Sequence, residues 1–378
     1  MAVPYLAPVN ADLDFLLAEV ARALQLTPEQ HALAVKHYTT IADWLAAPES
    51  SVARFKPYIY PQGSMALETT VRPRKREEYD LDFVCQMLNT GLSAIEVFQL
   101  VFARIRAHGT YAPMLKPMNR CVRIDYAHNF HMDIIPAEPD RQRSGTAIVV
   151  PDRTLESWTP SNPLGYVAWF TQRSSITLPG VRKAMAPLPG PTPSDEKPSL
   201  TIAVQLMKRR RDMLCDDDTS PRSIVLTTLA GEYYSGGDVF TALTQIVAGI
   251  QHRIAAAHPK HITVCNPTNT DERFCESFEG AGRYEAFKWY IGQLERDLAR
   301  IAAARGIPEL ERILSETFGE EPVAKAVLSY GKRHTGKRDA GALQFSGAGV
   351  GGLSVVTPAS GMKHSAPSHR YFGSDVEE

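Results

Sequence analysis

The chain has 378 residues, of which 41 are basic and 42 acidic, so its formal net charge is −1. This balance excludes a protein that coats nucleic acid through a general basic excess, and any site for polyanions must be local. The length exceeds the usual limit for one hydrophobic core and predicts two closely packed lobes.

The five cysteines form no CxxC pair, which favours buried thiols in a reducing compartment over a zinc site. The sequence starts without a basic segment followed by an apolar one, and no apolar run approaches membrane-spanning length. We therefore expect a cytoplasmic protein with no membrane contact and no extended nucleic-acid surface.

Residues 10–48 predict two helices, the second with a capping box formed by Thr27 and Gln30. From about residue 57 to 136 the pattern changes to short apolar runs, interrupted by one helix that begins at the capping box of Ser93. These runs predict strands in "PYIYP", "DLDFVCQM", "YAPMLK", "CVRIDY" and "FHMDIIPA", the last two joined by a hairpin connection at residues 127–129. Residues 1–160 are thus expected to form a lobe with a mixed sheet.

Residues 161–198 predict one helix, "NPLGYVAWFTQR", and a long loop rich in proline and glycine. Between residues 199 and 330 nearly every periodic segment is helical, the last being "PELERILSETFGEEPVAKAVLSYG". Residues 331–378 are rich in glycine and serine and predict a disordered tail. The expected fold class is α+β, with an all-helical C-terminal lobe.

Asp80 and Asp82 interrupt a segment that is otherwise typical of a buried strand. Residues two apart in a strand share a face, so these carboxylates project together and repel each other. Their burial is costly unless a cation lies between them, and Mg²⁺ is usually held by one or two carboxylates plus phosphate oxygens. We therefore predict a metal site, to which a neighbouring strand would add Asp133.

Three carboxylates can hold two metal ions, and two-metal sites serve in-line phosphoryl displacement. Gly63 and Ser64 provide a turn with exposed N–H groups and a hydroxyl, which together suit a triphosphate. A Gly-Ser turn alone is weak evidence. It becomes specific when an Asp-x-Asp strand and a third strand acid follow it.

This arrangement resembles the nucleotidyltransferase superfamily of DNA polymerase β type. The segments "PQGSMALETTVRP", "EYDLDFV" and "MDIIPA" resemble more narrowly the bacterial nucleotidyltransferases (CD-NTases) related to cyclic GMP-AMP synthase and to 2′-5′-oligoadenylate synthetase. The similarity covers residues 10–305. It implies a polymerase β-like lobe, with the active site in the cleft between the two lobes, and the synthesis of a cyclic di- or trinucleotide second messenger in antiphage (CBASS) signalling.

By this resemblance, Asp80 and Asp82 hold two Mg²⁺ ions, with Mn²⁺ as the alternative, and Asp133 completes the site for the attacking hydroxyl. The substrates implied are nucleoside triphosphates such as ATP and GTP, and pyrophosphate is released.

The resemblance also implies phosphate contacts. Gly63 and Ser64 would bind the triphosphate, and Lys208 matches a basic residue that reaches back to the phosphates. Ser223, before "IVLTTLA", is a weaker candidate for the same role.

Other acids compete for these roles. Asp125 is an alternative to Asp133 as the third carboxylate, but Arg123 shares its face, and an ion pair between these two residues explains it. Glu77 and Glu78 lie among basic residues and indicate a solvated loop.

Two further groups have structural explanations. Arg209, Arg210 and Arg211 are expected on a solvated helix face near Asp216–Asp218, since four consecutive helical residues cannot all face one site with Lys208. The aromatic residues of "YEAFKWYIGQL" recur at helical spacing and are expected in the core: Tyr284, Phe287, Trp289 and Tyr290.

Two other functions are compatible with the same residues. One is transfer of a nucleotide to an RNA, a protein or a small molecule. The other is a catalytically inactive nucleotide sensor or scaffold, against which the intact acids argue. A regulatory protein partner that contacts the C-terminal tail is compatible with each of these.

Overall fold

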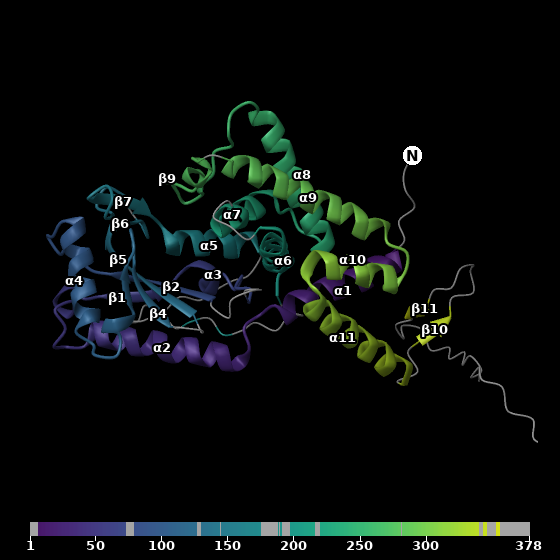
Figure 1. Ribbon diagram of the computed structural model, residues 1–378, viewed down its shortest axis with the longest axis horizontal. Helices are drawn as coiled ribbons and strands as arrows, with labels where there is room; N and C mark the ends of the chain where they lie inside the picture. The colour runs from purple at the N-terminus through teal and green to yellow at the C-terminus, as the bar shows by residue number, and fades with distance from the viewer. Residues whose placement is uncertain are drawn as a thin grey trace, which may run out of the picture.

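The computed structural model of the chain describes residues 7–72, 79–126, 130–143, 145–174, 188, 190, 197–215, 220–280, 282–339, 343–345 and 353–355. A lobe built around a β-sheet lies at one end, and a lobe of helices follows it along the long axis (Figure 1). The predicted α+β fold with a mixed sheet is confirmed. In the described part of the chain, no helix is long and apolar enough to cross a bilayer.

The sheet of the first lobe has the strand order β1-β2-β5-β4-β3, and β6 and β7 continue it from β5. β2 and β5 are parallel, whereas the other neighbouring strands are antiparallel. The β6–β7 hairpin was not expected from the sequence, and residues 127–129 lie outside the described ranges. The strands are β1 (Tyr58–Pro61), β2 (Tyr79–Gln86), β3 (Leu115–Pro117), β4 (Val122–Tyr126), β5 (Phe130–Pro139), β6 (Ile148–Asp152) and β7 (Ser157–Ser161).

The helices α2 (Pro28–Ala46) and α4 (Ala94–Arg106) share an apolar core with one face of this sheet. Both begin at the predicted capping boxes, in which the hydroxyls of Thr27 and Ser93 accept hydrogen bonds from backbone N–H groups three residues later. These two helices do not cover the opposite face of the sheet. The connections contain the short helices η1 (Ala53–Phe55), α3 (Gly63–Ala66) and η2 (Ala112–Met114).

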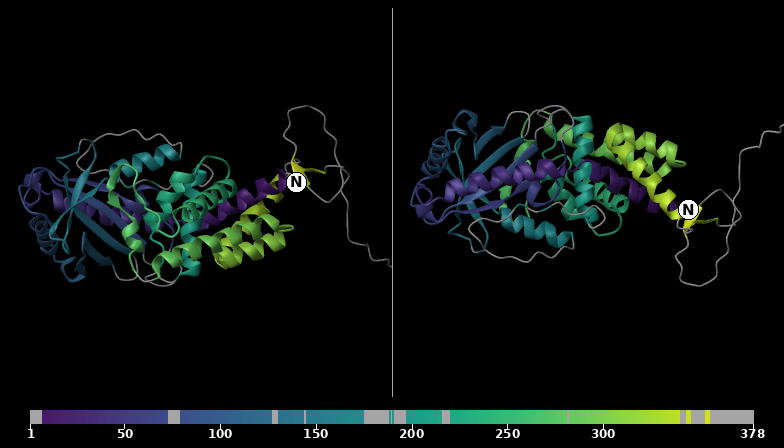
Figure 2. Two further views of the ribbon diagram at one scale, coloured as in Figure 1. Left: turned by 90° about the horizontal axis from the view of Figure 1, so that it is seen from above. Right: turned by 90° about the horizontal axis from the view of Figure 1, so that it is seen from below.

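The second lobe has its own, larger apolar core, which also includes α1 (Ala7–Ala23). α1 lies beside α11 (Glu320–Asp339), so the first helix of the chain packs with the helical lobe (Figure 2). α5 (Pro163–Arg173) leads into this lobe from β7. Its other helices are α6 (Ser199–Leu214), α7 (Ser223–Tyr233), α8 (Val239–Ala257), α9 (Arg283–Ala303) and α10 (Ile307–Phe318).

Three features of this lobe differ from the sequence prediction. A hairpin of β8 (Cys265–Asn266) and β9 (Asn269–Arg273), followed by η3 (Cys275–Phe278), means that the lobe is not all-helical. The last helical segment is divided into α10 and α11 at Gly319, whose φ of 100° is incompatible with a helix. α11 reaches Asp339, so the predicted disorder is wrong for residues 331–339, and β10 (Leu343–Phe345) pairs with β11 (Leu353–Val355).

The aromatic residues of α9 divide between core and surface. Tyr284, Phe287 and Tyr290 are buried as predicted, but Trp289 is 47% exposed, so the core prediction was wrong for this residue. Most of the loop predicted at residues 178–198 lies outside the described ranges.

The β8–β9 hairpin connects the second lobe to the first. The carboxylate of Glu272 accepts hydrogen bonds from Ser161 Oγ at 2.8 Å, from the backbone N–H of Asn162 at 3.0 Å and from Asn266 Nδ2 at 2.6 Å. Burial raises the pKa of Glu272, although these hydrogen bonds act in the opposite direction. This side chain therefore joins β9 to the segment between β7 and α5.

Candidate active site

Asp80 and Asp82 lie on the face of β2 that points away from α2 and α4. The intervening Leu81, together with Phe83, belongs to the core shared with those helices, and alternation along the strand turns the two acids to the other side. In the parallel pairing of β2 with β5, Asp82 lies directly opposite Asp133. The three predicted carboxylates therefore come together on one face of the sheet.

The Gly-Ser turn lies against this cluster. Gly63 begins α3 with a φ of +62°, and a Cβ atom built on it would collide with Asp82 Oδ2. The backbone N–H of Gln62 donates to the carbonyl of Asp82 at 2.9 Å, which continues the β1–β2 pairing into the turn. Ser64 Oγ accepts a hydrogen bond from Thr70 Oγ1 at 3.1 Å. The predicted phosphate cradle and the acid pair are thus adjacent.

Ionisation of the three neighbouring carboxyl groups, those of Asp80, Asp82 and Asp133, is energetically unfavourable. Burial, together with the neighbouring Asp80 and Asp133, raises the pKa of Asp82 to about 8. Burial and the charge of Asp133 also raise the pKa of Asp80. Carboxylates repelled in this way are stabilised in their ionised form by a nearby cation.

The fit of these residues to a metal ion differs among the three. Asp80 and Asp82 fit a divalent cation, because their carboxylates share a face and their repulsion favours a positive charge between them. Asp133 is already paired with Arg123. Within the described ranges, no three acidic, histidine or cysteine side chains are arranged to hold one metal ion.

Arg123 on β4 is directly opposite Asp133, and its guanidinium forms two hydrogen bonds of 2.7 Å with the two carboxylate oxygens. The expected pairing of Arg123 with Asp125 was therefore wrong. Asp125 is instead paired with Lys116 on β3, and His131 Nδ1 lies 2.9 Å from it. The register of the β4–β5 hairpin decides this, because it aligns Arg123 with Asp133.

Lys208 on α6 is buried and contacts the chain just beyond α3. Its Nζ donates to the carbonyl oxygen of Thr69 at 3.2 Å and to Thr69 Oγ1 at 2.9 Å. Burial, and then the charge of Arg211, lower the pKa of Lys208 to about 7. In this structure Lys208 thus holds the segment after the turn, and a direct phosphate contact stays a prediction.

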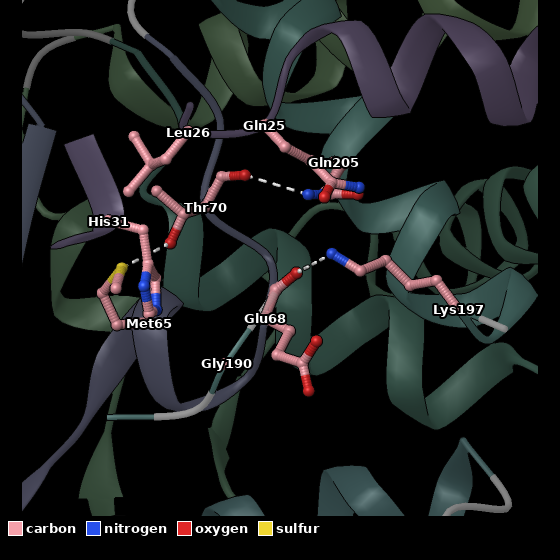
Figure 3. A pocket seen from close by; sticks show the side chains of 9 residues that line it. All are labelled: Gln25, Leu26, His31, Met65, Glu68, Thr70, Gly190, Lys197 and Gln205. Carbon is pink, nitrogen blue, oxygen red and sulfur yellow. Dashed lines mark hydrogen bonds between the residues drawn. The ribbon is translucent and has the colours of Figure 1, made fainter. Parts of the chain in front are cut away.

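Two more side chains of the helical lobe hold the same segment, which we call the strap (residues 68–70). Lys197 Nζ donates to the carbonyl of Glu68 at 3.2 Å, and Gln205 Nε2 donates to the carbonyl of Thr70 at 2.9 Å (Figure 3). Together with Met65 of α3, they line a cavity of about 50 Å³. Neither residue was expected from the sequence, although Gln205 lies three positions before Lys208, on the same face of α6.

Ser223 begins α7 and accepts a hydrogen bond of 2.7 Å from Arg211 Nη1. Arg209 and Arg210 are buried, so their predicted solvated face was wrong. Arg209 donates to the carbonyl of Phe318, and Arg210 forms an ion pair with Asp297. Residues 77–78 and 216–218 lie outside the described ranges.

Comparisons with known proteins show which proteins this chain is similar to. Residues 15–174 match the family model of the Second Messenger Oligonucleotide or Dinucleotide Synthetase domain. A c-di-GMP synthase of Roseivirga ehrenbergii is 29% identical over 342 residues, which cover 88% of this chain and 91% of that protein. The cyclic dinucleotide synthase CdnG of Bradyrhizobium diazoefficiens is 27% identical over 359 residues, which cover 86% of this chain and 85% of CdnG.

The structure of this Bradyrhizobium CD-NTase, CdnG, in complex with GTP superimposes with a TM-score of 0.67 and 24% identity. The superposition covers 84% of this chain and 99% of the CdnG chain. It shows that the two chains share their fold. The resemblance to bacterial CD-NTases is thereby confirmed from the matched domain, from relatives along most of the chain and from the fold.

Proposed function

We propose that the chain is a template-independent nucleotidyltransferase that joins nucleoside triphosphates into a cyclic di- or trinucleotide and releases pyrophosphate at each bond. The register of β2 and β5 carries this proposal, because it sets Asp82 opposite Asp133 while the turn at Gly63 touches Asp82. Relatives named as a c-di-GMP synthase and a cyclic dinucleotide synthase support the same class of reaction.

In the proposed reaction, the backbone N–H groups of the turn at Gly63 and the hydroxyl of Ser64 bind the triphosphate of the donor nucleotide. Asp80 and Asp82 would hold Mg²⁺, which would neutralise phosphate charge and lower the pKa of the attacking hydroxyl. Asp133 would complete the metal site for the attacking hydroxyl. The O–P bond to the pyrophosphate breaks as the new phosphodiester bond forms in line with it.

GTP is the first substrate to test. The Bradyrhizobium structure contains GTP, and the Roseivirga relative is named for a product made of two guanine nucleotides. We propose the same substrate class for this chain, with ATP, CTP and UTP as comparisons.

The test is incubation of the purified chain with α-labelled nucleotides and Mg²⁺, followed by phosphatase treatment and mass spectrometry. A phosphatase-resistant cyclic product is expected. Replacing both Asp80→Asn and Asp82→Asn should lower its yield at least about 100-fold, since the charge stabilisation of the transition state is lost. Asp125→Asn is the matched control, because Asp125 lies outside the cluster and pairs with Lys116.

An unchanged yield in the Asp80→Asn, Asp82→Asn double variant would overturn the proposal. Label on an added RNA, protein or small-molecule acceptor, without a cyclic product, would favour the alternative transfer reaction. We also propose that the product acts as a second messenger in antiphage defence and that residues 331–378 contact a regulatory protein. Phage plating on cells that carry the chain or its double variant, with the genes that surround it, tests the defence role.

A further inference from the structure

The pairing of Arg123 with Asp133 is built into the sheet. The two residues are directly opposite each other in the β4–β5 ladder, and their side chains are 25% and 12% exposed. The Nε and Nη2 atoms of the guanidinium each lie 2.7 Å from a different oxygen of the carboxylate. This two-pronged geometry is the strongest arrangement that an arginine and a carboxylate adopt.

Asp133 has a second strand neighbour on its other side. Asp82 on β2 is directly opposite it, so Arg123, Asp133 and Asp82 form a row across three strands. Arg123 already donates to each oxygen of Asp133. Both oxygens of Asp133 are therefore engaged, which agrees with the finding that no set of three ligands surrounds one point among the described residues.

The other acid on β4, Asp125, does not compete for Arg123. Asp125 is paired with Lys116 and lies 2.9 Å from His131 Nδ1. The charge of Arg123 also acts on Asp80 and Asp82, since it lowers the pKa of each against the stronger effect of burial. A cation of the protein itself thus neutralises part of the cluster.

We propose that Arg123 is a positioning residue that occupies Asp133 in the nucleotide-free protein and releases it as a metal ligand when a nucleotide phosphate draws the guanidinium away. This inference rests on the proposed function. A phosphate offers a guanidinium the same two-pronged contact that Asp133 does, so the exchange keeps both charges paired. The third ligand then becomes available only in the presence of nucleotide, so the complete metal site does not form before nucleotide binds.

The test is a titration of the nucleotide-free protein with Mn²⁺. Electron paramagnetic resonance measures the concentration of free Mn²⁺ and so gives the affinity. Arg123→Gln should bind Mn²⁺ about tenfold more tightly than the wild type, because Asp133 is no longer occupied. Arg123→Lys keeps the charge but loses the two-pronged contact, so its affinity should be intermediate. Lys116→Gln, the matched control, removes a neighbouring cation that pairs with Asp125 and should leave the Mn²⁺ affinity unchanged.

Loss of the positive charge of Arg123 could by itself strengthen Mn²⁺ binding. The double variant Arg123→Gln, Asp133→Asn separates this effect from the release of Asp133, because it should lose the tenfold gain in Mn²⁺ affinity. Retention of the gain in that variant, or wild-type or weaker binding by Arg123→Gln, would overturn the inference. Thermal unfolding checks that each variant is folded, and Arg123→Met replaces Arg123→Gln if the latter is not. The assay contains no nucleotide, so a failure of the proposed synthesis reaction is seen separately, in the product assay.

Discussion

The Cα atom of Gly63 lies against the carboxylate of Asp82, so the turn that begins α3 has no room for a side chain. A Cβ atom at position 63 would overlap Asp82 Oδ2 and lie 3.3 Å from Asp82 Cγ. The φ of +62° at Gly63 is also one that other residues rarely adopt. The phosphate turn and the acid-bearing strand therefore form one packed unit.

Gly63→Ala should lower the rate of product formation at least about 100-fold, because either the turn or Asp82 must move from its place in the site. Initial rates at saturating nucleotide measure this. Gly91→Ala is the matched control: its φ is +69°, but nothing lies within 4 Å of the added Cβ. Gly91→Ala should keep its activity and lose about 1 kcal/mol of unfolding free energy. An equal loss of activity in both variants would attribute the effect to backbone strain alone.

Gln205→Leu should weaken nucleotide binding by about tenfold through the strap. The change leaves the carbonyl of Thr70 without its donor, at a cost of about 1–3 kcal/mol, and Thr70 Oγ1 is the hydrogen-bond donor to Ser64. Binding of a non-hydrolysable nucleoside triphosphate measures the effect. Mn²⁺ binding at Asp80 and Asp82 should be unchanged, since Gln205 donates to the carbonyl of Thr70 and not to either acid.

The matched control for this variant is Gln251→Leu on α8. It removes an exposed hydrogen bond between α8 and Glu295 on α9, neither of which donates to the strap, and should leave nucleotide binding at the wild-type level. Wild-type nucleotide affinity in Gln205→Leu, or an equal loss in both variants, would contradict the role of the strap.

The sequence predicts a residue's role in this site where that role depends only on neighbours in the same strand or helix. The shared face of Asp80 and Asp82 follows from strand alternation, and the capping boxes of α2 and α4 involve residues three apart, so each was predicted correctly. The separation of α10 from α11 depends on one backbone angle at Gly319, which a helical apolar pattern on both sides conceals.

The partners of Arg123 and Lys208 could not be predicted in the same way. Arg123 can face Asp125 on its own strand or Asp133 on the next, and only the register of the hairpin selects Asp133. Helical periodicity places Lys208 on one face of α6 but does not say that Thr69 lies opposite it. Both contacts join segments that are distant in the sequence or on different strands.

Asp82→Asn should change how the stability of the metal-free protein depends on pH. A carboxyl group whose pKa is raised from 3.8 to about 8 stabilises the folded state fully below pH 3.8, and this contribution is lost as the pH rises through about 8. The amide does not ionise, so the unfolding free energy of the variant, relative to that of the wild type, should grow by about 4 kcal/mol between pH 5 and pH 9. Urea unfolding in EDTA measures this difference.

Lys208, whose pKa is lowered to about 7, has the opposite dependence, because its neutral form is favoured and stability is lost as the pH falls. It is present in both proteins, so it largely cancels from the comparison of wild type with Asp82→Asn. Mg²⁺ should reduce the variant's advantage at pH 9, since a bound cation stabilises the ionised carboxylate. Stability curves that stay parallel from pH 5 to pH 9 would contradict the assignment.

Glu272→Ala should separate the β8–β9 hairpin from the first lobe. The change leaves Ser161 Oγ and the backbone N–H of Asn162 without their acceptor, and we expect a loss of about 2–4 kcal/mol of unfolding free energy. Hydrogen exchange should accelerate in residues 265–273 and around Asn162, while α2 and α4 keep their protection. The neighbouring Asp271→Ala removes only an exposed ion pair with Arg143 and should cost less than about 1 kcal/mol. Similar losses in the two variants would mean that the buried acceptor of Glu272 does not hold the lobes together, and that the hairpin is fixed mainly by its remaining contacts with β7.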